Sequence, residues 1–409
     1  MSYQIIDGGV TAAKGFQAAG VPAGIKYQNR PDMAMVYSQK PCIAVGTFTS
    51  NVVKAAPVQW DMRLLKEKKA IHAIIANSGI ANASTGKPGM EACLETAACA
   101  AKLLQIDQDS VLLGSTGVIG MQLPVDRLRA GVSALVSSLD TGRQAANDAE
   151  RAIMTTDTVP KEVAVTLTLS GKQVTIGGMS KGSGMIHPDM CTMLAYITTD
   201  VRMNRELLDE LVKKDILDTF NMISVDGDTS TNDTYLVLAN GEAENPEITE
   251  KNADYEAFAE ALHYVNETLA KKMAKDGEGA HALYEAKVIG AAGKAEARKL
   301  ARSMVSSSLC KAAIFGHDAN FGRFLCALGY AGVPFDPEHM ALYFESRAGK
   351  LLIYEDGLQA SYEEEEAERI LSEDEVTIIA DMKQGDGKAC AWGCDLSYDY
   401  VKINADYRS

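Results

Sequence analysis

The chain has 409 residues, of which 46% are hydrophobic and 23% charged, with a formal net charge of −15 and a pI near 5.0. This composition is typical of a globular protein with a large core, and it speaks against nucleic acids and anionic membranes as partners, because Lys and Arg clusters bind those. No basic leader and no apolar run of about 20 residues occurs, so we expect a cytoplasmic protein that acts on small molecules.

Apolar runs and turn signals alternate along the chain, which predicts mixed α/β structure. In the first half we expect a strand and turn over 70–84, a helix over 91–104, a strand and Gly-rich turn over 111–120, and an alternating strand over 163–170. In the second half we expect a helix over 205–220, a strand over 234–240, helices over 254–275 and 295–307, and an exposed, Glu-rich helix or loop over 361–374. The absence of a Pro-rich or low-complexity linker predicts one interlocked fold.

The eight cysteines form no C-x-x-C pair and no zinc-finger spacing, so we interpret them as reduced and mostly buried thiols. Cys191 is disfavoured as a nucleophile, since His187 is its only near histidine in sequence. The acidic stretch SVDGDTSTND fails the EF-hand template, because Thr231 stands where Gly is needed, and a side-chain-capped turn is expected. His317 is interpreted as a structural, hydrogen-bonded residue. We predict no metal site.

The stretch GSTGVIG, Gly114 to Gly120, follows an apolar run and resembles a strand that leads into a Gly-rich turn. Such a turn can aim backbone N–H groups at an anion, either a phosphate or the oxyanion of an acyl-transfer intermediate. The P-loop pattern is absent, which weakens the phosphate interpretation. Taken alone, the stretch is most simply a structural turn.

The stretch SKGSGMIHPDMCTMLAYITTD contains small residues that lead to Thr192, after which the sequence becomes apolar. A Thr inside a chain is a poor nucleophile, whereas a Thr that begins a chain has its own α-amine as a nearby base. The pattern therefore raises the question of whether the chain cuts itself between Cys191 and Thr192.

Several stretches, in order along nearly the whole chain, together resemble the ornithine acetyltransferases of arginine biosynthesis, also called glutamate N-acetyltransferases or the ArgJ family. These stretches are GGVTAAKGF, NSGIANAS, GSTGVIG, MTTDT, SKGSGMIHPDMCTML, SVDGDTSTNDT, GEGA, GHDANFGR and WGCDLSYDYVKINADYRS. The chain departs from the family pattern at Cys191, where Ala is usual, at Ile80, where Asn is usual, and at Ser409, where Thr is common. These departures affect substrate contacts more than the reaction class.

The resemblance implies self-cleavage into an α chain, 1–191, and a β chain, 192–409, which interlock as one fold. Thr192 would take the acetyl group from N-acetylornithine and pass it to glutamate by a ping-pong mechanism. Thr116, through its side chain, and Gly117, through its N–H, would stabilise the oxyanion. Members of the family differ in whether acetyl-CoA also serves as donor, so amino-acid N-acetyltransferase activity stays open.

The resemblance also implies a set of residues that line the substrate site. They are Thr155, with Thr156 as the alternative, Lys181, Thr192, Glu278, Asn404 and Ser409. Lys181 would suit a substrate carboxylate and Glu278 a substrate ammonium. No cofactor and no metal is implied.

The fold implied is a layered α/β sandwich of the N-terminal-nucleophile-like type with a smaller α/β domain, assembled as a heterotetramer of two α and two β chains. One alternative is an N-terminal-nucleophile amidohydrolase or aminopeptidase, in which water replaces glutamate as acceptor. Another is an uncut ligand-binding protein that uses GSTGVIG to hold a phosphate.

Overall fold

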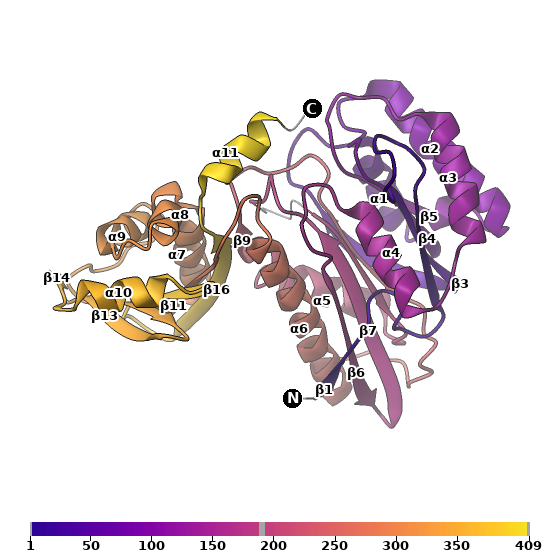
Figure 1. Cartoon of the computed structure of the whole chain (residues 1–409). Coiled ribbons are helices and arrows are strands. Elements are labelled where there is room, and N and C mark those ends of the chain that lie inside the picture. The colour runs from indigo at the N-terminus through magenta and orange to yellow at the C-terminus, as the bar shows by residue number, and fades with distance from the viewer. Residues whose placement is uncertain (1, 188–192, 407–409) are drawn as a thin grey trace. The chain divides into compact units, whose positions relative to one another are not determined.

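The computed structural model describes residues 2–187 and 193–406. The chain forms two compact units (Figure 1). The first unit comprises Met1–Gly182, Asp189–Ile216 and Thr229–Leu269, and the second comprises Ser183–Pro188, Leu217–Asp228 and Ala270–Ser409. Among the described residues, no helix has both the length and the apolar character needed to cross a membrane.

The first unit is built on a nine-stranded sheet in the order β1-β6-β7-β8-β10-β3-β4-β5, with β2 paired to β3. The strands are β1 (Tyr3–Ile6), β2 (Phe16–Val21), β3 (Met33–Phe48), β4 (Ile71–Asn77), β5 (Val111–Ser115), β6 (Glu162–Leu169), β7 (Lys172–Lys181), β8 (Leu194–Thr199) and β10 (Thr234–Ala239). The pairs β4–β5 and β8–β10 are parallel. Every residue of β8 and β10 is buried, as expected for central strands covered on both faces.

Helices cover both faces of this sheet. They are α1 (Ala56–Lys66), α2 (Gly86–Leu104), α3 (Val125–Ser137), α4 (Arg143–Ile153), α5 (Arg205–Asp215) and α6 (Ala253–Lys275). On one face, Tyr196 and Leu236 belong to the apolar cluster that contains buried residues of α1 to α4. On the other face, Tyr235 donates a hydrogen bond to Asn266 of α6 at 3.0 Å. The unit is therefore a helix–sheet–helix sandwich.

The strands β7 and β8 flank the expected cut in sequence and are antiparallel neighbours in the sheet. Their last and first residues, Lys181 and Leu194, are register partners. The sheet of the first unit thus contains strands from both sides of the Cys191–Thr192 bond, while the cut itself stays a prediction.

The second unit contains a seven-stranded sheet in the order β14-β13-β12-β15-β11-β16-β9. Its strands are β9 (Ile223–Ser224), β11 (Leu283–Ala291), β12 (Ala341–Ser346), β13 (Gly349–Glu355), β14 (Leu358–Gln359), β15 (Glu375–Asp381) and β16 (Gly387–Cys394). Its helices are α7 (Lys294–Ser306), α8 (Ser308–Phe315), α9 (Phe321–Gly329), α10 (Glu364–Leu371) and α11 (Tyr398–Ala405). Helix α7 packs on β11 and β16, whereas α11 has no buried residue.

The structure confirms the mixed α/β class and corrects some element bounds. Helix α2 begins at Gly86, five residues before the expected start at Glu91. Helix α5 ends at Asp215, because the chain after it forms turns and a short 3-10 helix at Phe220–Met222. In the Glu-rich segment, α10 buries Ala367, Ile370 and Leu371, so the acidic residues belong to an amphipathic helix rather than to a wholly solvated one.

Candidate functional site

The GSTGVIG stretch forms the turn that the sequence predicts, at the carboxyl end of β5. Since β4 and β5 are parallel neighbours, the turns that follow them meet at one edge of the sheet. The Thr116 N–H donates to the Asn77 carbonyl at 3.0 Å, and the Val118 N–H donates to the Gly79 carbonyl at 3.1 Å. These bonds fix Thr116 and Val118, and therefore also Gly117, which lies between them in the chain.

Gly117 occupies a position that only glycine can take without strain. Its φ is 129°, and a Cβ there would lie 2.2 Å from the Gly79 carbonyl carbon and 2.4 Å from its oxygen. Within the part of the chain that the structure describes, the Gly117 N–H donates to no protein acceptor. A fixed N–H of this kind is available to stabilise an oxyanion.

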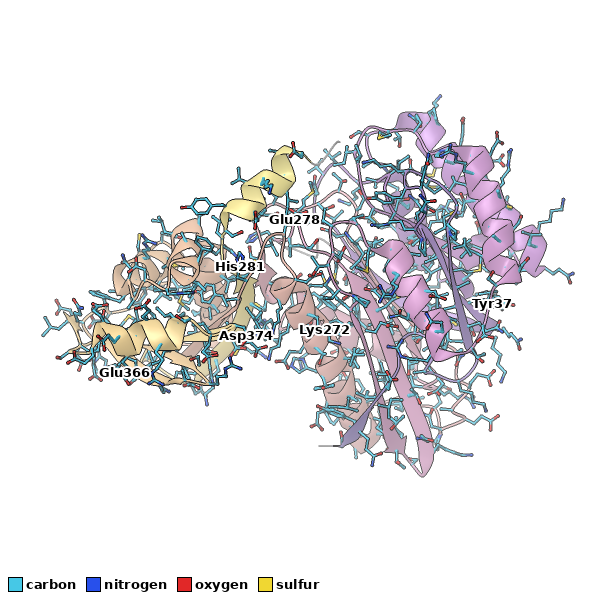
Figure 2. All side chains as sticks on the ribbon, in the orientation of Figure 1. Tyr37, Lys272, Glu278, His281, Glu366 and Asp374 are labelled. Carbon is cyan, nitrogen blue, oxygen red and sulfur yellow. The ribbon has the colours of Figure 1, made fainter. Side chains whose placement is uncertain are left out.

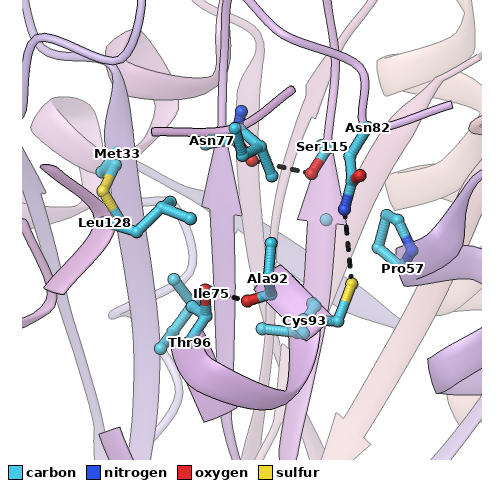
Figure 3. A pocket seen from close by; sticks show the side chains of 13 residues that line it. Met33, Pro57, Ile75, Asn77, Asn82, Ala92, Cys93, Thr96, Ser115 and Leu128 are labelled. Atoms are coloured by element: carbon cyan, nitrogen blue, oxygen red, sulfur yellow. Dashed lines mark hydrogen bonds between the residues drawn. The ribbon is translucent and has the colours of Figure 1, made fainter. Parts of the chain in front are cut away.

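A small cavity lies behind this turn, between the sheet and helices α2 and α3 (Figure 3). Ser115 donates to the Asn77 side-chain oxygen at 2.7 Å, and Asn82 donates to the Cys93 sulfur at 3.4 Å (Figure 3). The cavity volume is about 20 Å³, enough for roughly one water molecule. It is too small for an amino-acid substrate, so we assign it to the support of the turn.

The Lys181 ammonium contacts the two predicted threonines of the first unit, Thr116 and Thr155. Its Nζ lies 2.8 Å from the Thr155 Oγ1 and 3.4 Å from the Thr116 Oγ1. It also lies 3.7 Å from the Asp157 Oδ2, and the Lys181 side chain is only 9% exposed. The structure therefore brings together Thr116, Thr155 and Lys181, and the threonine that Lys181 contacts in MTTDT is Thr155.

Asp157, whose side chain is fully buried, belongs to this cluster, although we predicted no role for it from the sequence. Its carboxylate accepts hydrogen bonds from the Thr155 N–H at 3.0 Å, the Gly182 N–H at 2.6 Å and the Lys161 Nζ at 2.7 Å. Burial alone would raise the Asp157 pKa, but the charges of Lys181 and Lys161 lower the pKa below its ordinary value. Asp157 is therefore ionised, although its side chain is 0% exposed.

Glu278 and Asn404, the predicted residues of the second unit, contact each other. The Asn404 Nδ2 donates to the Glu278 Oε2 at 2.7 Å, which joins the Glu278 carboxylate to helix α11. The position of Glu278 is labelled in Figure 2. A Cβ on Gly184 would lie 2.3 to 2.4 Å from the Glu278 carboxylate, so the backbone approaches that carboxylate closely. Glu278 is 6% exposed. Two further candidates, Thr192 with its neighbour Cys191 and the terminal Ser409, lie outside the described residues.

The SVDGDTSTND stretch is a side-chain-capped turn, as predicted. Asp226 accepts from the N–H groups of Met185 at 2.5 Å and Ile186 at 2.9 Å. Tyr400 of α11 donates to the same carboxylate at 3.2 Å. The turn thereby fixes the segment that precedes the expected cut. Over residues 2–187 and 193–406, no group of three or more His, Cys, Asp or Glu is placed to hold a metal.

The chain is similar to known proteins over nearly its whole length. The sequence model of the ArgJ family matches residues 17–409. The arginine biosynthesis bifunctional protein ArgJ 1 of Clostridium acetobutylicum is 49% identical over 400 residues, which cover 98% of this chain and 97% of the relative. The corresponding ArgJ of Symbiobacterium thermophilum is 50% identical over 404 residues, with 98% and 99% coverage.

Among solved structures, the ornithine acetyltransferase complexed with ornithine from Mycobacterium tuberculosis is 41% identical. It covers 47% of this chain and 100% of its own, with a TM-score of 0.43. The family match and the two full-length relatives are decisive by themselves: this chain belongs to the ArgJ family.

Proposed function

We propose that this protein is an acetyltransferase of arginine biosynthesis that moves the acetyl group of N-acetylornithine to glutamate through an acetyl-Thr192 intermediate. The observation that carries the proposal is the Thr116–Gly117 turn, with an N–H that has no protein acceptor among the described residues, in a chain of the ArgJ family. Family membership supplies the reaction class, and the turn supplies the chemistry that acyl transfer needs.

The first step is self-processing. The Thr192 hydroxyl attacks the Cys191 carbonyl carbon, and the C–N bond between the two residues breaks as an ester forms. Water then hydrolyses the ester, which returns the Thr192 hydroxyl and leaves a free α-amine. An α-amine has a pKa of about 8, which suits a base that works near neutral pH. Thr192 thus becomes a nucleophile with its own base.

The second step is acetyl transfer. The α-amine accepts the hydroxyl proton as the Thr192 oxygen attacks the acetyl carbonyl carbon of N-acetylornithine. The Thr116 hydroxyl and the Gly117 N–H donate to the oxyanion that forms. The intermediate collapses to acetyl-Thr192, and the same proton goes to the departing ornithine nitrogen. Glutamate then enters, and its amine attacks the ester in the reverse sequence, which makes the kinetics ping-pong.

The residues that we assign to substrate contact are Thr155, Lys181, Glu278, Asn404 and Ser409. The charge of Lys181 suits a substrate carboxylate, and the carboxylate of Glu278 suits a substrate ammonium. The Asn404 amide, which donates to Glu278, would orient that carboxylate. The position of the cut between 1–191 and 192–409, the heterotetramer and the cytoplasmic location remain predictions.

The experiment supplies purified protein with N-acetylornithine and glutamate and measures acetylglutamate and free acetate separately. Acetylglutamate as the main product supports transfer, whereas acetate without acetylglutamate would favour the amidohydrolase alternative. Relatives are named bifunctional, so a second assay replaces N-acetylornithine by acetyl-CoA and tests amino-acid N-acetyltransferase activity. An intact chain on denaturing electrophoresis, with no transfer, would contradict the proposal.

A further inference from the structure

We propose that Asp157 is a positioning residue for acetyl transfer, which acts through Lys181 to hold the Thr116 hydroxyl with its proton directed toward the reacting oxygen. The inference rests on the proposed function, because it assumes that Thr116 donates to an oxyanion. It gives a role to Asp157, which lies in the MTTDT stretch but is not among the residues assigned to the oxyanion or to substrate contact.

The direction of the hydrogen bonds in the cluster follows from the chemistry of lysine. An ammonium group donates three hydrogen bonds and accepts none. In the contact between the Lys181 Nζ and the Thr116 Oγ1, the threonine oxygen must therefore accept. Its own O–H proton then cannot point at Lys181 and remains available for another acceptor. Lys181 thus sets Thr116 as a donor, which is the role an oxyanion requires.

The Asp157 carboxylate fixes Lys181 and its surroundings through several contacts. The carboxylate contacts the Lys181 Nζ and accepts a hydrogen bond from the N–H of Gly182, which follows Lys181 in the chain. It also accepts a hydrogen bond from the N–H of Thr155, whose hydroxyl contacts Lys181. One buried carboxylate therefore holds both the backbone beside Lys181 and the nearest acceptor of its ammonium. A small shift of Asp157 would move the Lys181–Thr116 contact as well.

The charges of the cluster complement an oxyanion. The Asp157 carboxylate lies 2.7 Å from the Lys161 Nζ and 3.7 Å from the Lys181 Nζ. Glu150 accepts from the Lys161 N–H at 2.8 Å, and burial raises the Glu150 pKa well above its ordinary value. The Lys181 ammonium lies 3.4 Å from the Thr116 Oγ1, the proposed donor to the oxygen on which negative charge develops in the transition state.

The test is a double-mutant cycle on transfer kinetics with the cleaved, full-length protein. Asp157→Asn is made in the wild-type chain and in Thr116→Ala, and the matched control is Glu150→Gln, a neutral replacement in the same buried cluster. We expect Asp157→Asn to lower kcat by about 10- to 100-fold with little change in KM. The reason is that Asp157, through Lys181 and Thr116, acts on charge that forms in the transition state. In Thr116→Ala the further loss should be less than about 3-fold, since the hydroxyl that Asp157 positions is gone. Glu150→Gln should stay within about 2-fold of wild type.

Equal kcat losses for Asp157→Asn in the two backgrounds would refute the proposal that Asp157 acts through the Thr116 hydroxyl. A rise in KM with kcat unchanged would also refute it. If Asp157→Asn does not fold, Lys181→Met in the same two backgrounds makes the same comparison, because its effect on kcat should also shrink without the Thr116 hydroxyl. If wild-type protein makes no acetylglutamate, the proposed function fails instead. The double-mutant cycle is then measured on the rate of cutting between Cys191 and Thr192. Equal rate losses for Asp157→Asn with and without the Thr116 hydroxyl would again refute the positioning role of Asp157.

Discussion

Replacement of Gly117 by alanine tests the oxyanion turn most directly. The new Cβ would lie 2.2 Å from the Gly79 carbonyl carbon, at a backbone φ of 129° that alanine rarely adopts. Carbon atoms in contact are normally about 3.5 Å apart, so the turn must open by more than about 1 Å. The Gly117 N–H would move by a similar distance. A displacement of this size costs roughly 10²-fold in rate, and loss of one oxyanion donor costs about 10²- to 10³-fold.

The matched control is Gly120→Ala in the same turn. Gly120 also has a positive φ, 85°, but a Cβ there would meet no atom within 4 Å. This variant should lose about 1 kcal/mol or more of unfolding free energy through backbone strain and keep kcat within a few-fold of wild type. Steady-state kinetics of acetylglutamate formation, with the melting temperature of each variant, separates the two effects. Equal kcat values for Gly117→Ala and Gly120→Ala would refute the assignment of the Gly117 N–H.

Three further predictions follow from the proposed chemistry and from the buried carboxyl. Thr192→Ala should give one uncut and inactive chain, and N-terminal sequencing of the wild-type protein should find a new start at Thr192; a different start would contradict the cut. Deletion of Tyr407 to Ser409 should abolish transfer but not cutting, so two fragments without acetylglutamate formation are expected, and full activity would remove Ser409 from the substrate contacts. Burial raises the Glu150 pKa, so the folded chain keeps a proton that the unfolded chain releases above about pH 4.3. The unfolding free energy of the wild type should therefore fall above that pH, by up to about 1.4 kcal/mol per pH unit. Glu150→Gln lacks this slope, so its stability relative to wild type, measured by chemical denaturation, should rise as the pH increases above about 5. Parallel pH profiles would show that Glu150 is ionised in the fold.

Elements with strong local signals were predictable from the sequence. The helix expected over 254–275 is α6, Ala253–Lys275, and Asn252 accepts from the Tyr255 N–H at its start, a pattern typical of a helix cap. The turn at GSTGVIG was also predictable, because glycines follow an apolar run. By contrast, α5 was expected to reach Phe220, since apolar residues continue past Asp215. The chain forms turns and a 3-10 helix there instead, in which Ile216 and Phe220 are buried and Leu217 is exposed.

Contacts between residues distant in sequence were not predictable. Strand β1 pairs with β6, Tyr3 opposite Leu167, and no local pattern indicates that choice. Asp157 was missed for a related reason. In sequence it resembles a polar turn residue, and only the approach of Lys161 and of Lys181 from β7 makes it a buried, ionised carboxylate. Its role depends on burial and on tertiary neighbours, which one sequence does not display.

The pairing of β7 with β8 gives a structural reason why a cut in this segment would leave the first unit assembled. Leu194 is the register partner of Lys181 on one side and of Thr234 on the other, so β8 is held by two neighbouring strands. The Thr234 N–H also donates to the Met193 carbonyl at 2.8 Å, which anchors the residue directly after Thr192 in sequence. None of these bonds depends on the peptide bond between Cys191 and Thr192. A new N-terminus at Thr192 would therefore begin two residues before β8, whose first residue, Leu194, is the register partner of Lys181. Lys181 in turn contacts Thr116. The framework that places Thr116 and Lys181 in the first unit therefore does not require an intact chain.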